Sequence, residues 1–244
     1  AWTPVFTGVT TKRQFFHTFP FDGVTFHNNT GGDCRGKRMA LFIQQIINGI
    51  MLGSVYSLVA LGLTLEYGIL HIPNFAHGAL YMVGAYFTFL LATALGLNFW
   101  LAMILSMMAL GLIGVLVERL VYRPLMLESP LSSFIAAIGL IFIFVDGALN
   151  IFGPDFKRFP PTHSQVLHVL GITITFQRII IVVVTISLIV LLHLFIKKTT
   201  MGATIEATAQ DREGAQLMGI NVKRVRMIVF ALGTALAAAA AALI

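Results

Sequence analysis

The side chains that could do chemistry in this sequence are few, and several of them interrupt strongly apolar segments. Asn74 and His77 follow Pro73, which lacks a backbone N–H and disfavours helix in the residue before it. Asn74 can cap a helix that restarts there, and polar groups at membrane depth usually face protein or water. We therefore treat Asn74 and His77 as candidate pathway or gating residues. The alternative is a capped turn at a membrane surface, with His77 hydrogen-bonded locally.

A second polar set lies in two other apolar segments. Asp146 and Asn150 are about one helical turn apart, and Gln177 and Arg178 lie near the start of the next segment. Because ionisable groups in membrane segments usually face the bundle interior, Asp146 is a third candidate for a pathway. The alternatives are a structural ion pair between Asp146 and Arg178, or side chains that reach the membrane surface.

The sequence lacks the residue sets that would indicate an enzyme. The patterns for a phosphate-binding loop (GxxxxGK[ST]), a zinc-protease helix (HExxH) and a serine nucleophile (GxSxG) are absent. His71 and His77 are too isolated to propose as metal ligands, and Cys34 is the single cysteine, which excludes an internal disulfide. We predict no catalytic residue, no metal site and no cofactor in this chain.

Residues 212–225 form a long polar stretch with membrane-grade apolar sequence on both sides. Residues 206–218 can form a short helix along the membrane surface, and Gly219 would end it in the left-handed conformation that glycine accepts. Gly214 and Ala215 are small enough to allow a partner protein to approach closely. The alternative is an ordinary loop that carries basic anchors for the next helix.

The composition places these residues in a membrane protein. The 244 residues are 57% hydrophobic and 11% charged, whereas a soluble domain has about 25% charged residues. Apolar runs of about 17–25 residues suit membrane-spanning helices, and the short alternating strands of a membrane barrel do not appear. We predict an all-α, polytopic transmembrane helix bundle with about six spanning segments, namely residues 41–65, 75–95, 99–121, 132–152, 174–196 and 227–244.

The charge distribution predicts the topology. Of the 16 Lys and Arg residues, five precede Met39 and six lie in residues 197–226, so we place the latter loop inside the cell. Residues 121–131 and 66–74 then fall inside, and residues 153–173 fall outside, as does a tight turn at Asn98. If residues 66–74 are instead a break within a re-entrant segment, the predicted orientation of the first helix across the membrane is reversed. The clustering of charge at segment ends argues against a nucleic-acid partner.

Several motifs together resemble one transporter family. The match runs in order from Met39 to Ile244, although the middle coupling-loop alanine is Gly214 here and Pro73 replaces a residue that is commonly not proline. Its residues are Gly62-Leu63-Thr64-Leu65, Ile72-Pro73-Asn74-Phe75-Ala76-His77-Gly78, Glu118-Arg119, Tyr122-Arg123-Pro124-Leu125, and Glu213-Gly214-Ala215 followed after three residues by Gly219. They resemble the signatures of LivH-type permeases, the membrane subunits of branched-chain amino acid ABC importers, including the coupling loop on which the ATPase pushes.

This resemblance implies a function, partners and a location. The chain would be a permease subunit for leucine, isoleucine or valine in a bacterial inner membrane, paired with a second, related permease subunit. Separate ATPase subunits would hold ATP and Mg²⁺, and a periplasmic binding protein would deliver the substrate. Alternatives are a related ABC permease for urea, amides or other amino acids, or a secondary transporter or channel without an ATPase.

The two ends of the chain differ from the rest of the family pattern. Residues 1–38 are polar and rich in Gly and Thr, and we expect a disordered extension outside the family. Residues 39–244 would be the permease domain, and the apolar run that stops at Ile244 without a flanking charge suggests that this domain is C-terminally incomplete.

Overall fold

The computed structural model describes residues 34–70, 74–125, 130–154, 166–169 and 172–244, and within them the chain is mainly helical. Among these described residues, six helices are long and apolar enough to cross a membrane, which confirms the predicted polytopic helix bundle. The spans agree with the expected segments to within a few residues at most ends. They are Leu41–Ile69, His77–Ala94, Phe99–Leu125, Leu131–Phe152, Gln177–Lys198 and Val222–Leu243.

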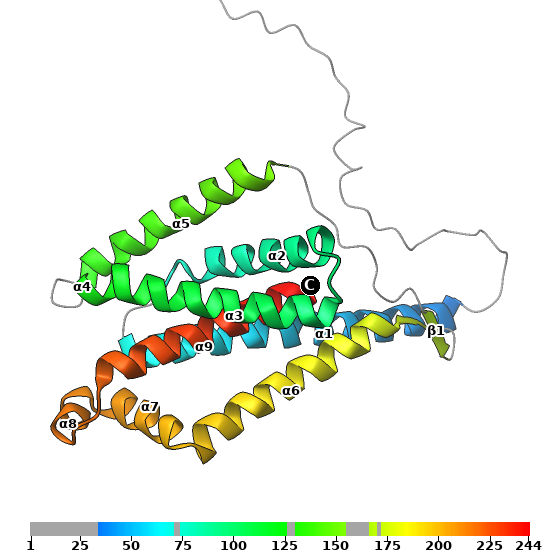
Figure 1. The fold of residues 1–244 in the computed structure, drawn as a ribbon. Coiled ribbons are helices and arrows are strands. Elements are labelled where there is room, and N and C mark those ends of the chain that lie inside the picture. Colours follow the sequence, from blue (N-terminus) through cyan, green and yellow to red (C-terminus); the bar gives the residue numbers. More distant parts are fainter. Residues whose placement is uncertain (1–33, 71–73, 126–129, 155–165, 170–171) are drawn as a thin grey trace, which may run out of the picture.

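Figure 1 shows the order of the elements along the chain. The first helix begins at Cys34, so residues 34–38 of the expected extension are helical. In order, the elements are α1 (Cys34–Leu70), α2 (His77–Ala94), α3 (Phe99–Val117), the π-helical turn η1 (Glu118–Tyr122), α4 (Arg123–Leu125), α5 (Pro130–Phe152), β1 (Val166–Val169), β2 (Ile172–Thr175), α6 (Phe176–Lys198), α7 (Thr200–Gln210), α8 (Arg212–Leu217) and α9 (Val222–Leu243).

The bundle is built around α9. Its membrane span is 72% buried, against 11–33% for the other five spans. It packs on α1, α2 and α3, and its second half is mostly alanine. Small side chains let helices approach closely: a Cβ at Gly84 of α2 would lie only 2.8 Å from the Ala238 Cα of α9. The alanine-rich helix therefore fits at the centre, where a bulky side chain would not.

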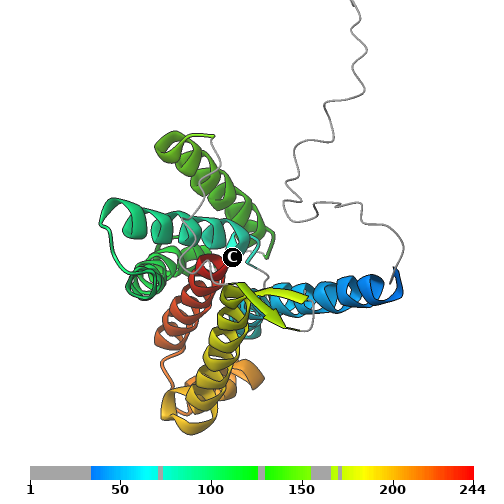
Figure 2. The same cartoon turned by 90° about the vertical axis from the view of Figure 1, so that its right-hand side faces the viewer.

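Helices α5 and α6 lie on opposite sides of this centre (Figures 1 and 2). Their exposed faces are rich in large aliphatic side chains such as Ile143, Ile151 and Leu191. Exposed apolar side chains are expected on a surface that meets lipid tails or another membrane subunit.

A short β-hairpin lies in the loop predicted to face outward, and the sequence reading did not foresee it. Strands β1 and β2 pair antiparallel, with Val166 opposite Thr175 and Val169 opposite Ile172. The β-branched residues of this stretch favour strands. The predicted fifth span therefore began too early, because residue 174 lies in β2 and the helix begins at Phe176.

The connections between the long helices lie at the two ends of the bundle (Figure 1). The hairpin, the turn from α2 to α3 at Asn98 and the C-terminal residue lie at one end. The other end holds α4, α7, α8 and the break between α1 and α2, and α1 runs unbroken between the two ends. We call the latter the basic end, since it carries Arg119, Arg123, Lys197, Lys198, Arg212, Lys223, Arg224 and Arg226. This arrangement matches the predicted alternation of the loops.

Candidate functional site

The loop between α6 and α9 folds into two short helices instead of the single helix predicted for residues 206–218. The chain is extended at Asp211, and the side chain of that residue accepts hydrogen bonds from the backbone N–H groups of Glu213 and Gly214, each at 3.0 Å. Aspartate is a favoured helix N-cap because it satisfies these otherwise unpaired donors. Asp211 therefore ends α7 and starts α8.

Gly219 ends α8 as predicted. Its φ is +83°, a conformation that costs little only for glycine. The N–H of Gly219 donates to the Gln216 carbonyl, and the N–H of Ile220 donates to the Ala215 carbonyl, both at 3.0 Å. This pair of bonds is the Schellman ending of a helix. Asn221 then caps α9 by accepting a hydrogen bond from the Arg224 N–H at 3.2 Å.

The exposed tip of α8 is apolar. Leu217 is 88% exposed and Met218 is 84% exposed, and Glu213 beside them is also exposed. Ala215 is only 5% exposed, so it packs inward, and the close approach of a partner expected at Gly214 and Ala215 stays a prediction. Two large apolar side chains therefore lie next to each other on the surface of an otherwise polar loop, where they are available for contact with another protein.

Gly214 has a local structural role. A Cβ at this position would lie 2.5 Å from Asp211 Oδ2, so glycine leaves room for the capping carboxylate. This contact explains why residue 214 is glycine here, whereas the family's coupling-loop motif has alanine at the same position.

A cluster of four buried polar side chains lies where α1 ends and α2 begins, and we call it the polar cluster. Asn74 Nδ2 donates to Glu66 Oε2 at 2.8 Å, and Tyr122 Oη donates to Asn74 Oδ1 at 2.6 Å. His77 Nδ1 lies 3.3 Å from Glu66 Oε1. All four residues are 2% exposed or less. The two hydrogen bonds and the approach of His77 to Glu66 offset part of the cost of burial, while within the described residues His77 Nε2 has no hydrogen-bond partner.

The backbone break positions Asn74 for these contacts. Asn74 Oδ1 also accepts a hydrogen bond from the Ala76 N–H at 3.1 Å, and its carbonyl accepts from the His77 N–H. The residue that immediately precedes α2 is Ala76, so Asn74 stabilises the turn before the helix instead of serving as its N-cap. Pro73 and His71 lie outside the described residues.

Two glycines on facing helices make room for the cluster. A Cβ at Gly233 of α9 would lie 2.5 Å from Glu66 Oε1, and a Cβ at Gly62 of α1 would lie 2.8 Å from the Gly233 carbonyl. The same Cβ at Gly62 would lie 3.2 Å from His77 Nε2. Helices α1 and α9 therefore cross closely at this level, and the carboxylate fits between them.

A buried ion pair lies near the polar cluster. Arg226 Nη2 of α9 is 3.0 Å from Glu118 Oε1 of η1, and the two side chains are 4% and 1% exposed. Glu118 and Tyr122 are the first and last residues of η1, where the Arg123 N–H donates to the Glu118 carbonyl. A hydrogen bond between residues five apart defines a π-helical turn. Such turns are rare in proteins, and those that occur are often at functional sites. Removing one partner of a buried ion pair would leave a charge uncompensated.

Sequence reasoning did not single out Glu66, Glu118 or Arg226. Glu66 was assigned only to a loop, and Glu118 was used only as part of a motif. The sequence does place a carboxylate near the end of a membrane span, and this feature could have identified Glu66 and Glu118. A charged side chain there has a high free-energy cost unless it has a partner. Glu66 contacts Asn74, eight residues further along the chain, whereas the partner of Glu118 is Arg226 on the distant helix α9.

The third candidate, Asp146, lies apart from these groups. Its side chain is exposed on α5, and its carbonyl accepts a hydrogen bond from Asn150 Nδ2 at 2.9 Å. Arg178 instead donates to Asn48 Oδ1 of α1, so the structure does not show the ion pair considered for Asp146. Within the described residues no group of three His, Cys, Asp or Glu side chains could hold a metal ion.

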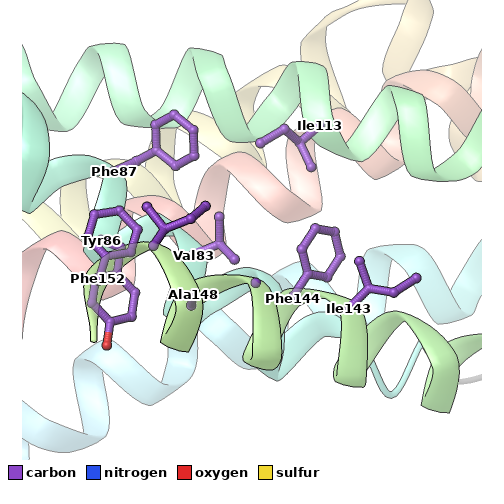
Figure 3. Close-up of a pocket in the computed structure, with 10 residues that line it drawn as sticks. Val83, Tyr86, Phe87, Ile113, Ile143, Phe144, Ala148 and Phe152 are labelled. Carbon is purple, nitrogen blue, oxygen red and sulfur yellow. The ribbon is translucent and has the colours of Figure 1, made fainter. Parts of the chain in front are cut away.

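An apolar cavity lies between α2, α3 and α5 (Figure 3). Its volume is about 280 Å³, and the stacked rings of Tyr86 and Phe152, with centroids 4.4 Å apart, form part of its wall. Val83, Ile113 and Phe144 are among the other lining residues (Figure 3). A zwitterion needs partners for both of its charges, so this wall does not form a site for a free amino acid.

Comparison with known proteins shows that most of this chain is similar in sequence to proteins of one family. The family model described as "Branched-chain amino acid transport system / permease component" matches residues 45–244. The chain is 36% identical over 217 residues to the high-affinity branched-chain amino acid transport system permease protein BraD of Pseudomonas aeruginosa, with 83% of this chain and 70% of BraD covered.

Two further relatives carry similar names. The chain is 35% identical to the high-affinity branched-chain amino acid transport system permease protein LivH of Escherichia coli K12, with 85% of this chain and 72% of that protein covered. It is 30% identical to the probable branched-chain amino acid transport permease protein LivH of Methanocaldococcus jannaschii, with 82% and 66% covered. No solved structure matches the chain.

Proposed function

This chain belongs to the family of branched-chain amino acid transport permease components, and we propose that it is a membrane subunit of an ATP-driven importer for leucine, isoleucine and valine. The family match covers residues 45–244, and the six spans supply the multi-pass bundle that a permease needs. The observation that carries the proposal is the joint presence of this match and a capped α8 with an apolar tip at the basic end.

The α8 tip is the proposed contact with an ATPase subunit. Leu217 and Met218 project from a helix fixed at both ends, by Asp211 and by Gly219. A rigid helix transmits a push, whereas a flexible loop would absorb it. Lys223 and Arg224 at the start of α9 add positive charge beside the tip, which favours an acidic rim on the partner. Glu213, Gly214, Ala215 and Gly219 then shape the coupling loop, and only some of them touch the partner.

The candidate pathway residues divide into two roles. Asn74 and His77 are enclosed by their own chain, so we assign them to a gating joint between α1 and α2 instead of an open wall. Asp146 is exposed on α5 within a membrane span, where contact with lipid would be costly. It would therefore face a second permease subunit or the water-filled path between the two subunits.

The remaining partners follow from the same assignment. ATP and Mg²⁺ would be held by the ATPase subunits, since this chain lacks the phosphate-binding pattern. A substrate-binding protein would dock at the hairpin end, opposite α8. The bundle would shift between inward and outward access as the ATPases close and open.

Competition for uptake tests the cargo. The chain, its ATPases, its partner permease and its binding protein are expressed in cells that lack their own branched-chain import. Labelled leucine uptake should be suppressed by excess isoleucine or valine and not by urea or acetamide. Suppression by urea or acetamide, or uptake that does not require the chain, would overturn the assignment.

A further inference from the structure

One π-helical turn, η1, carries two buried polar contacts to different parts of the bundle. Its first residue, Glu118, pairs with Arg226 of α9, and its last residue, Tyr122, bonds Asn74 at the break between α1 and α2. The residues between them include Arg119 and Leu120, which are exposed. The turn thus directs both of its terminal side chains into the protein.

The contact between Glu118 and Arg226 lies in the first turns of α9, the helix that follows the coupling loop. Arg226 is the fifth residue of α9, and only residues 218–221 separate α8 from α9. Val222, Val225 and Arg226 are all buried in the first turns of α9. Arg226 lies about 6 Å along the helix axis from the first residue of α9. A displacement of α8 that moves the start of α9 would therefore also move Arg226.

The Tyr122 contact reaches the polar cluster. Its hydroxyl donates to the same Asn74 oxygen that accepts the Ala76 N–H, so the phenol holds the turn that starts α2. The Tyr122 ring packs against Phe230 of α9, with ring centroids 5.2 Å apart. The phenol thus contacts both the break and the helix that leaves the coupling loop.

We propose that Glu118 and Tyr122 are positioning residues that join the start of α9 to the α1–α2 break, so that movement of α8 is transmitted to the gating joint. This inference rests on the proposed function, in which an ATPase moves α8. Apolar contacts between the same helices can slide by small steps. A buried ion pair and a buried hydrogen bond hold one geometry, because shifting either leaves a polar group unpaired.

The electrostatics of the basic end make Glu118 important in this link. Arg123 and Arg212 both interact electrostatically with Arg226. Glu118 is the carboxylate that pairs with the buried guanidinium. Without it, like charges would repel at the root of α9, and the helix start would move relative to η1.

The test uses the whole importer in proteoliposomes, with ATP hydrolysis and leucine uptake measured in the same sample. Tyr122→Phe removes one hydroxyl and keeps the ring. We expect leucine uptake per ATP hydrolysed to fall about three- to tenfold, in line with one buried hydrogen bond. Tyr67→Phe is the matched control, since Tyr67 is an exposed tyrosine of α1, and its ratio should equal that of the unmodified complex.

The Glu118→Gln variant and the double variant separate transmission from simple packing. Glu118→Gln should lower the same ratio, and Glu118→Gln with Tyr122→Phe should be no worse than the more damaging single change, because both interrupt one link. An unchanged ratio in Tyr122→Phe, or multiplied losses in the double variant, would overturn the inference. Failure of the proposed function looks different: the unmodified complex would then show no ATP-dependent leucine uptake at all.

Discussion

At the residue scale, Asn74 is the centre of the polar cluster. Its amide contacts Glu66, Tyr122 and the Ala76 N–H. Asn74→Ala should lower the free energy of unfolding by about 2–4 kcal/mol, because it removes the hydrogen-bond partner of Glu66 Oε2 and of the buried Tyr122 hydroxyl. Thermal unfolding of the detergent-solubilised complex measures this loss.

Asn98→Ala is the control for that experiment. Asn98 is exposed, and its side chain makes no capping hydrogen bond before α3, so its replacement should have little effect. Equal stability of the two variants would contradict the cluster. Uptake per folded complex adds a second readout, since normal specific uptake in the surviving Asn74→Ala protein would remove Asn74 from the gating joint.

Gly219 allows a test of the coupling loop at one position. Gly219→Glu places a bulky charge beside the α8 tip and a side chain at a φ of +83°. We expect leucine uptake to be lost while the protein stays in the membrane, because the loop no longer fits its ATPase. The measurement is uptake together with ATPase activity in the assembled complex.

Gly153→Glu supplies the matched comparison for Gly219→Glu. Gly153 has a φ of +77° at the end of α5, so it shares the backbone strain but lies outside the coupling loop. Uptake should survive this change. Similar losses in both variants would show that strain, and not the position of α8, explains the Gly219 result.

At the element scale, the close packing of α9 makes a prediction about helix glycines. Gly84→Ala should destabilise the bundle by about 1–3 kcal/mol, because the added carbon would lie 2.8 Å from the backbone of α9 and 2.9 Å from Leu110. Gly139→Ala on α5 meets no atom within 4 Å, and it should be neutral or stabilising. Thermal unfolding of both variants measures the difference, and equal stabilities would contradict the central position of α9.

The sequence predicted the elements better than their contacts. Length and hydropathy identify the six spans, because each span must cross the same apolar layer. The β1–β2 hairpin was missed because β-branched residues also occur in membrane helices. The division of the coupling loop at Asp211 was missed although an N-cap residue marked the position.

The polar cluster could not be derived from the sequence alone. Asn74 and His77 stood out because they follow a proline in apolar sequence. Glu66 became part of the same site only through its neighbours, since its carboxylate fits beside Gly233 of α9. Tyr122 joins the cluster from 48 residues beyond Asn74, and no local pattern connects two residues so far apart in the chain.

At the scale of the whole molecule, the two ends of the bundle should face opposite sides of the membrane. Cys34 is the single native cysteine and can be replaced by serine. In that background, a cysteine at Gln210 of α7 should resist an impermeant thiol reagent in intact cells and react after permeabilisation. A cysteine at Asn98 should react in intact cells, and the reverse pattern would contradict the topology.

The central claim is that this permease couples to an ATPase through α8, and leucine accumulation in proteoliposomes tests it most directly. The complete complex is reconstituted with the substrate-binding protein on the hairpin side and either ATP or ADP on the α8 side. The account predicts that labelled leucine accumulates against its gradient with ATP, and that ADP or Gly219→Glu abolishes accumulation. Equal leucine entry with ATP and ADP would contradict the account and indicate a channel or a secondary transporter.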